Sequence, residues 1–291
     1  MISVVIPNYN SEKLLAKNLP KLLDLLKKTK LNFEIIVVDD ASTDNSLSYL
    51  RNLSHLRILK NSKNLGFAST VDRGIRAARG EIVFTLKTDC LPESPDYFRL
   101  MKDAIASLQH DGKKVFSVTA GLKTIENGKE EIRGAGEIYF EKGFFLHRRS
   151  WSNWSNLTNL TNFFTDWPDG SASAFNKEIY LKLGGFDKIY DPFYWEDVDL
   201  GFRARKAGYL CVFEPKAILI HEHEEGAINR HYSPEQVKEI SLRNQFIFTW
   251  KNGNATQLIA HWLLLIFYFR DRSFLKAFFL AIVNFPLAFF R

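Results

Sequence analysis

The sequence predicts an α/β fold in which a mostly parallel central sheet carries helices on both sides. Three observations support this prediction. Short apolar runs alternate with amphipathic helical patterns over residues 1–86, short links join them, and the apolar runs lack the polar alternation of strands that face water. Such continuous apolar runs are typical of parallel strands that are buried on both faces.

The first half of the chain shows this alternation most regularly. Ile2–Ile6 is a short β-rich run, and Glu12–Lys28 follows as a helical pattern with its leucines on one broad face. Phe33–Val38 is a second strand, and Ser42–Asp44 provides a helix start. The same patterns predict a strand at 56–59, a helix at 66–79 and a strand at 81–86.

The order of elements is less regular after about residue 110. Residues 151–162 are rich in polar turn formers and predict a loop. The other patterns predict strands at 115–121, 132–140, 210–213 and 217–220, a short helix at 175–183, a helix that starts in the acidic stretch 194–199 and ends at Gly208, and helices from about Pro234 onward.

The C-terminal segment is unusually apolar. Leu258–Phe269 has almost no polar group, and 277–290 is apolar apart from Asn284 and Pro286. Neither run reaches the roughly 20 residues that a membrane-spanning helix needs. Two interpretations remain: a buried core helix, or a segment that lies in a membrane interface, for which the basic residues beside phenylalanine and tryptophan are suited.

Composition bounds the choice of partners. The net charge of +6 is compatible with a nucleic acid, an anionic membrane or a phosphorylated ligand. The basic residues form no continuous stripe, so we expect no nucleic-acid binding. The two cysteines have no metal-type spacing and predict a reducing compartment rather than a disulfide framework. The N-terminal run lacks the features of a secretory signal.

Polar residues follow two of the predicted strands, where ligands bind in such sheets. Asp39-Asp40 could accept hydrogen bonds from a nucleobase or ribose, or could only cap a helix. Asp89, in Lys87-Thr88-Asp89, could hold a divalent cation that bridges phosphate oxygens. Lys87 could instead neutralise phosphate, or could simply be solvated.

Two further stretches carry candidate groups. His221–Glu225 offers a histidine pair for a metal, but it reads equally well as a polar loop. In Trp195-Glu196-Asp197, an ionised carboxylate near a helix N-terminus could act as a general base. Tyr194 and Trp195 would offer a wall for a sugar ring. The plainer interpretation places these acids, with Asp199, in a first helical turn.

Five stretches occur in a specific order: VVIPNYN, EIIVVDDASTDNS, NLGFASTVDRGIRAARGEIVFTLKTD, FNKEIYLKLGGFD and WEDVDLGFRARKAG. In order and spacing this set resembles the family 2 glycosyltransferases. The resemblance covers residues 1–225 and implies a GT-A fold and an inverting transfer of a sugar from a nucleotide-sugar donor. It also implies a nucleotide-sugar half at about 1–110, an acceptor half at about 111–225 and a separate C-terminal helical segment at 226–291.

The resemblance also implies a role for each matching position. On the donor side, the nucleotide-sugar-binding positions are Pro7, Tyr9, Asp40, Asn64, Gly66, Lys87, Thr88 and Asp89, with Asp40 reading the base. Asp197 would be the catalytic base, with Glu196 beside it. Tyr194 and Trp195 would shape the acceptor side, and Trp151 and Trp154 would close over the acceptor unless they belong to an ordinary surface loop.

One departure from the family pattern concerns the metal. At the DxD position this chain has Lys87-Thr88-Asp89, so only the last acid remains. The implied cofactor, Mn²⁺ or Mg²⁺, would depend on Asp89, His221 and the phosphates of the donor, and would be weakly bound or dispensable. The alternative is a catalytically silent module that binds a glycan or a nucleotide sugar.

The resemblance finally implies partners and a location. The donor would be a nucleotide-diphosphate sugar, and the acceptor a glycan or a lipid-linked molecule in the synthesis of cell-surface polysaccharide. A lipid-linked acceptor would place the chain in the cytoplasm, peripheral on the inner face of the cell membrane, with the C-terminal segment on the anionic surface.

Overall fold

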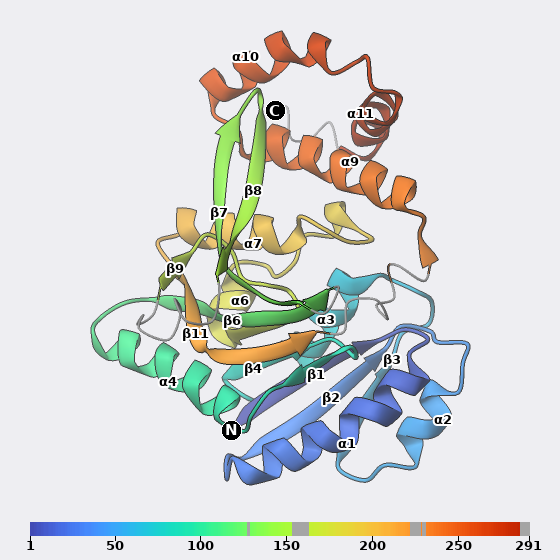
Figure 1. Cartoon of the computed structure of the whole chain (residues 1–291), viewed down its shortest axis with the longest axis vertical. Coiled ribbons are helices and arrows are strands. Elements are labelled where there is room, and N and C mark those ends of the chain that lie inside the picture. Colours follow the sequence, from blue (N-terminus) through green and yellow to red (C-terminus); the bar gives the residue numbers. More distant parts are fainter. Residues whose placement is uncertain (127–128, 153–162, 222–227, 229–230, 286–291) are drawn as a thin grey trace.

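A mixed sheet with strand order β3-β2-β1-β4-β10-β6-β11-β5 forms the centre of the molecule (Figure 1). The computed structural model describes residues 1–126, 129–152, 163–221, 228 and 231–285. The strands are β1 (Ile2–Asn8), β2 (Phe33–Asp39), β3 (Leu56–Lys60), β4 (Ile82–Leu86), β5 (Cys90–Pro92), β6 (Val115–Glu126), β7 (Lys129–Glu141), β8 (Phe144–Ser152), β9 (Phe163–Thr165), β10 (Ala172–Asn176) and β11 (Leu210–His221).

Helices cover both faces of this sheet and extend the molecule beyond it. They are α1 (Glu12–Lys28), α2 (Ser46–Arg51), α3 (Phe67–Ala77), α4 (Asp96–His110), α6 (Lys177–Lys182), α7 (Glu196–Lys206), α9 (Pro234–Asn252), α10 (Ala255–Leu264) and α11 (Arg272–Asn284), with short 3-10 turns η1 (Lys188–Tyr190) and η3 (Leu265–Phe267).

Most of the central strands run in the same direction. β3, β2, β1 and β4 pair in parallel, and so do β6 and β11. β10 is inserted antiparallel between β4 and β6, which leaves those two strands parallel to each other. The predicted mostly parallel α/β sheet is therefore confirmed.

Both faces of the sheet are buried, as the apolar runs predicted. Val4 packs into one core with residues of α1 and α4, and its neighbour Val5 packs into a second core with residues of α3 and α6. Successive side chains of a strand point to opposite faces, so an apolar residue at every position implies two apolar surroundings.

A third core joins the C-terminal helices to the rest of the chain. The hairpin β7–β8 rises from the sheet and reaches α9 and α10 (Figure 1). Phe144 and Phe145 of β8, Trp195 and Val198 near the start of α7, and Phe246 and Phe248 of α9 are buried in this core. Helix α11 contributes Phe274, Ala277 and Ala281 to this core, and α10 places the buried ring of His261 against Phe144.

The outer faces of α10, η3 and α11 remain in solvent. Leu263 and Ile266 are each 70% exposed, and Val283 is 81% exposed, whereas Ala277 and Ala281 are fully covered. The covered face agrees with the interpretation as a core helix, and membrane contact of the exposed face stays a prediction. Among the described residues, no helix combines the length and apolarity that crossing a bilayer requires.

Three local predictions were wrong. Phe175 lies in β10 rather than at the start of a helix, because it pairs with both β4 and β6. The strands predicted at 210–213 and 217–220 are one strand, β11, with an irregularity between Glu214 and Ile218. Trp151 belongs to β8 and pairs with Arg133, so the prediction of a loop is wrong for residues 151 and 152, and the rest of 151–162 lies outside the described residues.

Candidate active site

A cleft of about 900 Å³ opens where β1, β2 and β4 end. It lies at the carboxyl ends of the parallel strands, where the topology predicts a ligand site. The sequence-predicted residues that line it are Pro7, Tyr9, Asp40, Asn64, Gly66, Lys87, Thr88, Asp89, Tyr194, Trp195, Glu196, Asp197 and His221. Trp154 lies outside the described residues, and Trp151 is described only as part of strand β8.

The predicted nucleotide side is organised by the carboxylate of Asp40. One of its oxygens accepts hydrogen bonds from the side chain of Asn61, at 2.7 Å, and from the amide of Leu65, at 2.8 Å. The other accepts from the amide of Gly66 at 2.9 Å. Asp40 therefore fixes the loop before α3, and Asn64 supports the same loop by accepting from Gly66 at 3.1 Å.

The same loop touches the segment that leads to the acids. Gly66 has φ +83°, and a β-carbon there would lie 3.3 Å from the carbonyl oxygen of Pro192. A residue with a side chain would be strained at this φ and would crowd the Pro192 backbone. Gly66 thus lets the donor-side loop and the segment before α7 approach each other closely.

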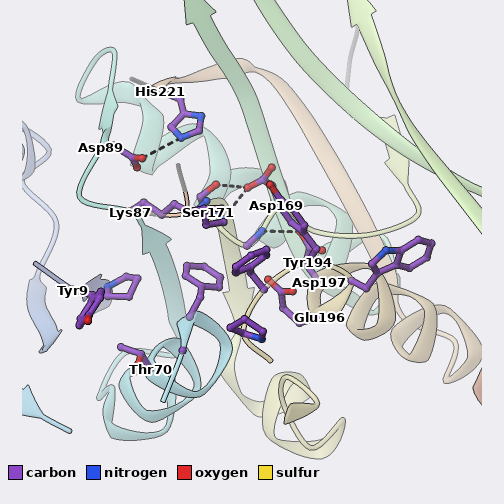
Figure 2. Close-up of a pocket in the computed structure, with 18 of the residues that line it drawn as sticks. Tyr9, Thr70, Lys87, Asp89, Asp169, Ser171, Tyr194, Glu196, Asp197 and His221 are labelled. Carbon is purple, nitrogen blue, oxygen red and sulfur yellow. Dashed lines mark hydrogen bonds and ion pairs between the residues drawn. The ribbon is translucent and has the colours of Figure 1, made fainter. Parts of the chain in front are cut away.

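Asp89 and His221 face each other at the other end of the cleft (Figure 2). Oδ2 of Asp89 lies 3.4 Å from Nε2 of His221, and the thiol of Cys90 lies 3.5 Å from Oδ1. Burial acts to raise the pKa of Asp89, but the bond from His221 and the charge of Lys87 bring it below its ordinary value. Asp89 is therefore ionised at neutral pH.

These groups are suitable ligands for a divalent cation, although they are few. The candidate ligand atoms of Asp89, Cys90 and His221 all lie within 4.8 Å of one another. A carboxylate and an imidazole are suitable ligands for Mn²⁺, and two protein ligands leave positions for phosphate oxygens and water. Cys90 is buried in the apolar core beneath the site, where burial raises the pKa of its thiol.

A strained turn leads into the acidic helix α7. Tyr194 and Trp195 both have positive φ, 69° and 73°, a conformation that bulky side chains rarely adopt. The buried side chain of Asn244, on α9, donates to the carbonyls of Phe193 and Tyr194, both at 2.9 Å. It also donates to the carbonyl of Tyr190 at 2.8 Å, so a C-terminal helix holds this turn in place.

The two aromatic residues of the turn differ in exposure. Tyr194 is 40% exposed at the cleft. Trp195 is 4% exposed and packs against His147 and Phe248, with ring centroids 4.8 and 5.0 Å away. Tyr194 therefore offers the larger free surface to a ligand, and Trp195 supports it from the core.

Glu196 and Asp197 occupy the first turn of α7 (Figure 2). Burial raises the pKa of Glu196 to about 8, and the neighbouring Asp197 adds to the shift. Burial also raises the pKa of Asp197, to about 6, although Arg149 acts to lower it. The pKa of Glu196 is raised more than that of Asp197, so Asp197 ionises first and is the member of the pair that can accept a proton.

The third acid, Asp199, faces away from the cleft into a buried ion cluster. Its side chain is fully covered and lies 2.9 Å from Nζ of Lys251 and 2.7 Å from Nε of Arg203. The hydroxyl of Tyr190 donates to it at 3.1 Å. Asp199 therefore connects α7 to α9, and its role is structural.

The structure adds residues that the sequence did not single out. Asp169 lies 3.0 Å from the guanidinium of Arg149 and accepts from the hydroxyl of Ser171 at 2.5 Å. Burial acts to raise its pKa, but Arg149 and Ser171 hold the pKa of Asp169 at about 2. Arg149 also stacks over the ring of Trp167, 5.0 Å from its centroid.

Arg149 and Asp169 belong to no sequence motif that predicts a functional site. Arg149 belongs to the hairpin strand β8 and pairs there with Gly136, where a side chain would overlap the ring of Trp167. Asp169 stands in the turn Trp167–Gly170, whose Pro-Asp-Gly sequence signals only a turn. Their partnership depends on how the hairpin folds over the cleft.

Comparison with known families identifies the chain. The family described as Glycosyl transferase family 2 matches residues 3–172, which is more than half of the sequence. The chain belongs to this family. The matched region includes all of the donor-side residues from Pro7 to Asp89 and ends within β10.

Two curated relatives are named for different reactions. The chain is 28% identical over 245 residues to a chondroitin synthase of Escherichia coli, which covers 77% of this chain and 34% of that protein. It is 32% identical over 108 residues to an undecaprenyl-phosphate 4-deoxy-4-formamido-L-arabinose transferase of Proteus mirabilis, covering 35% and 33%. The chain thus spans about a third of the length of these two relatives.

Solved structures share the fold. S. aureus TarS 1–349 in complex with UDP-GlcNAc superposes with a TM-score of 0.58 at 19% identity, covering 99% of this chain and 82% of that one. The mannosyltransferase PcManGT from Pyrobaculum calidifontis, in complex with GDP-Man and Mn²⁺, gives 0.55 at 18% identity, covering 99% and 81%. The fold of this family 2 chain is therefore the GT-A glycosyltransferase fold.

Proposed function

We propose that this chain is an inverting glycosyltransferase that moves a sugar from a nucleotide-diphosphate sugar to a hydroxyl of a glycan or lipid-linked acceptor. One observation carries the proposal. Asp197, the acid of the pair that ionises first and whose carboxylate accepts two backbone hydrogen bonds, lines the same cleft as the strand-end residues Asp40 and Asp89. A single cleft thus offers a donor site and a base.

The donor side would hold the nucleotide through the loops after β1 and β2. Pro7 and Tyr9 line the cleft there, and Asp40 holds the Asn64–Gly66 loop against it. A divalent cation bound by Asp89 and His221 would neutralise charge on the donor's diphosphate. Support for such a cation comes from the Mn²⁺ in the PcManGT complex, and the sparse ligand set argues for weak binding.

The acceptor side would supply the base. The acceptor hydroxyl oxygen forms a bond to the anomeric carbon while the bond from that carbon to the diphosphate oxygen breaks. Asp197 takes the hydroxyl proton, and the nucleoside diphosphate leaves with the electron pair of the broken bond. One displacement from the opposite face inverts the configuration. Tyr194 would position the acceptor ring, and the buried Trp195 would support Tyr194.

The acceptor class is proposed from the relatives and from the C-terminal surface. One relative is named for undecaprenyl phosphate, and another is a chondroitin synthase. The exposed apolar face of α10, η3 and α11 would rest on an anionic membrane, with basic residues such as Arg270 beside it. We place the protein at the cytoplasmic face of the cell membrane, in the synthesis of surface polysaccharide.

One observation favours a second function. Lys87 replaces the first acid of the family's metal motif, so the chain could be a catalytically silent module that binds a nucleotide sugar or glycan. The intact pair Glu196-Asp197 favours an enzyme.

An experiment in two stages tests the proposed reaction. A thermal-shift screen against UDP-, GDP- and dTDP-sugars first identifies the donor, because a ligand that binds the folded state raises its Tm. The chosen donor is then incubated with and without Mn²⁺ or Mg²⁺, with candidate acceptors, and the products are analysed by NMR. We expect donor cleavage and an inverted anomeric centre. Binding without turnover would support the silent module, and retained configuration would contradict the mechanism.

A further inference from the structure

Lys87 presents a cationic group at the centre of the cleft. It follows β4 directly, and its ammonium lies 5.3 Å from the ring centroid of Phe67. Within the described part of the chain, no carboxylate or carbonyl oxygen lies within hydrogen-bond or ion-pair distance of this ammonium. Figure 2 shows Lys87 between Asp89 on one side and Asp169 on the other.

Other cations of the cleft wall are paired. Arg149 lies 3.0 Å from a carboxylate oxygen of Asp169, and Arg148 lies 2.8 Å from one of Glu137. Lys87 is partly buried, and its ammonium has no direct partner among the described residues, so an anionic ligand could pair with it without first breaking an ion pair. Lys87 is thus preformed for an anion in a way that Arg148 and Arg149 are not.

The surroundings indicate which anion would bind. Asp89, the one acid left in the DxD position, lies two residues away and lines the same cleft. A diphosphate placed near Asp89 would be repelled by it unless a positive charge stood beside both groups. The ammonium of Lys87 is such a charge, and it lies in the wall of the cleft that the proposed function assigns to the donor.

We propose that Lys87 is a built-in cation for the donor's diphosphate, and that this chain therefore binds nucleoside diphosphates without requiring a divalent metal. The inference rests on the proposed function, since it assumes that the cleft takes a nucleotide-diphosphate sugar. This role explains why a lysine occupies the position. Its ammonium supplies the positive charge that a metal ion, bound by two carboxylates, would otherwise supply.

The test measures binding of UDP, GDP and dTDP by calorimetry, in EDTA and in Mn²⁺, without any turnover. Wild-type protein should bind one of them in EDTA within about threefold of its affinity in Mn²⁺. Lys87→Met keeps an apolar stem against Phe67 and should lose tenfold or more in EDTA, the usual size of a charge-assisted hydrogen bond. Lys87→Asp restores two acids to the motif and should bind only with Mn²⁺.

The control is Lys21→Ala, an exposed lysine of α1 that does not line the cleft, which should behave as wild type. Circular dichroism checks that each variant is folded. If wild-type protein binds a nucleotide in Mn²⁺ but binds it in EDTA no more tightly than Lys87→Met does, the inference fails and the proposed function stands. If wild-type protein binds none of the nucleotides under either condition, both fail.

Discussion

The backbone amide of Gly170 donates a hydrogen bond to Oδ2 of Asp197 across 3.3 Å. The contact joins the turn before β10 to the first turn of α7. The amide of Val198 donates to Oδ1 at 2.8 Å, so each oxygen of this carboxylate has a backbone donor. The hydrogen bonds orient the group and oppose the burial that raises its pKa to about 6.

The first prediction separates the two adjacent acids. Asp197→Asn should fold normally and should slow transfer by about 100-fold or more, the lower range of general-base effects, because an amide cannot accept the proton. Glu196→Gln should slow transfer by less than about tenfold, because burial and the neighbouring Asp197 favour the protonated form of Glu196, which the amide mimics. Initial rates of donor consumption with acceptor present measure both. Near-normal transfer by Asp197→Asn would remove Asp197 from its role.

The second prediction concerns pH. Asp197 must be ionised to act, and its pKa is about 6, so the rate should fall as the pH drops through 6 and level off above. Arg149 lowers this pKa, so Arg149→Ala should move the acid limb of the profile to higher pH, and Arg149→Lys should restore much of the wild-type position. The matched control is Arg99→Ala, on the exposed side of α4, which should leave the limb in place. An unmoved limb in Arg149→Ala would refute this electrostatic role.

The third prediction concerns stability. Asp199 is fully buried between Lys251 and Arg203, and removing one member of a buried ion cluster leaves an uncompensated charge. Asp199→Asn should therefore lower the free energy of unfolding by about 3 kcal/mol. Asp96→Asn breaks the exposed pair with Arg99 and should change it by less than about 1 kcal/mol. Urea denaturation followed by circular dichroism gives both values. An equal loss in the free energy of unfolding in the two variants would show that the buried cluster contributes no more to stability than the exposed pair.

The fourth prediction tests the membrane surface. Leu263 and Ile266 are each 70% exposed, so replacing both with Glu should leave the core intact and remove the apolar contact. Burying each such side chain contributes roughly 1.5–3 kcal/mol, so binding to phosphatidylglycerol vesicles should weaken tenfold or more. Co-sedimentation measures this. Phe164→Glu, which also replaces an exposed apolar residue but on β9, should bind as wild type. If wild-type protein does not bind such vesicles, the exposed apolar face of α10, η3 and α11 is not a membrane-binding surface.

Point substitutions are preferable to truncation for this test. Phe274, Ala277 and Ala281 of α11 are buried against the core that includes Phe246 of α9. Deleting α10 and α11 would expose this core, so a change in solubility or vesicle binding would have two explanations. The Glu variants change only the face that solvent already reaches.

Much of the donor side could be predicted because it is local in the chain. The carboxyl ends of parallel strands lie at the same edge of a sheet, so the sequence alone predicts that Pro7, Asp40 and Asp89 lie near one another. The start of α7 at Glu196 was likewise readable from its acids. The sequence does not predict which of these acids faces the cleft and which has a structural role, because the orientation and burial of Asp199 depend on its contacts with α9.

The amino-acid sequence by itself determined the α/β class, the edge at which the cleft forms and the apolar character of the C-terminal segment. Only the tertiary structure decided that Arg149 and Asp169 meet beside Asp197, that Asn244 holds the turn at Tyr194, and which face of α10 and α11 stays in solvent. The physical reason is range. Periodicity and strand-end position act over a few residues, whereas these contacts join residues as far apart as His261 and Gly143, which are 118 positions apart, and they depend on how the hairpin and α9 pack.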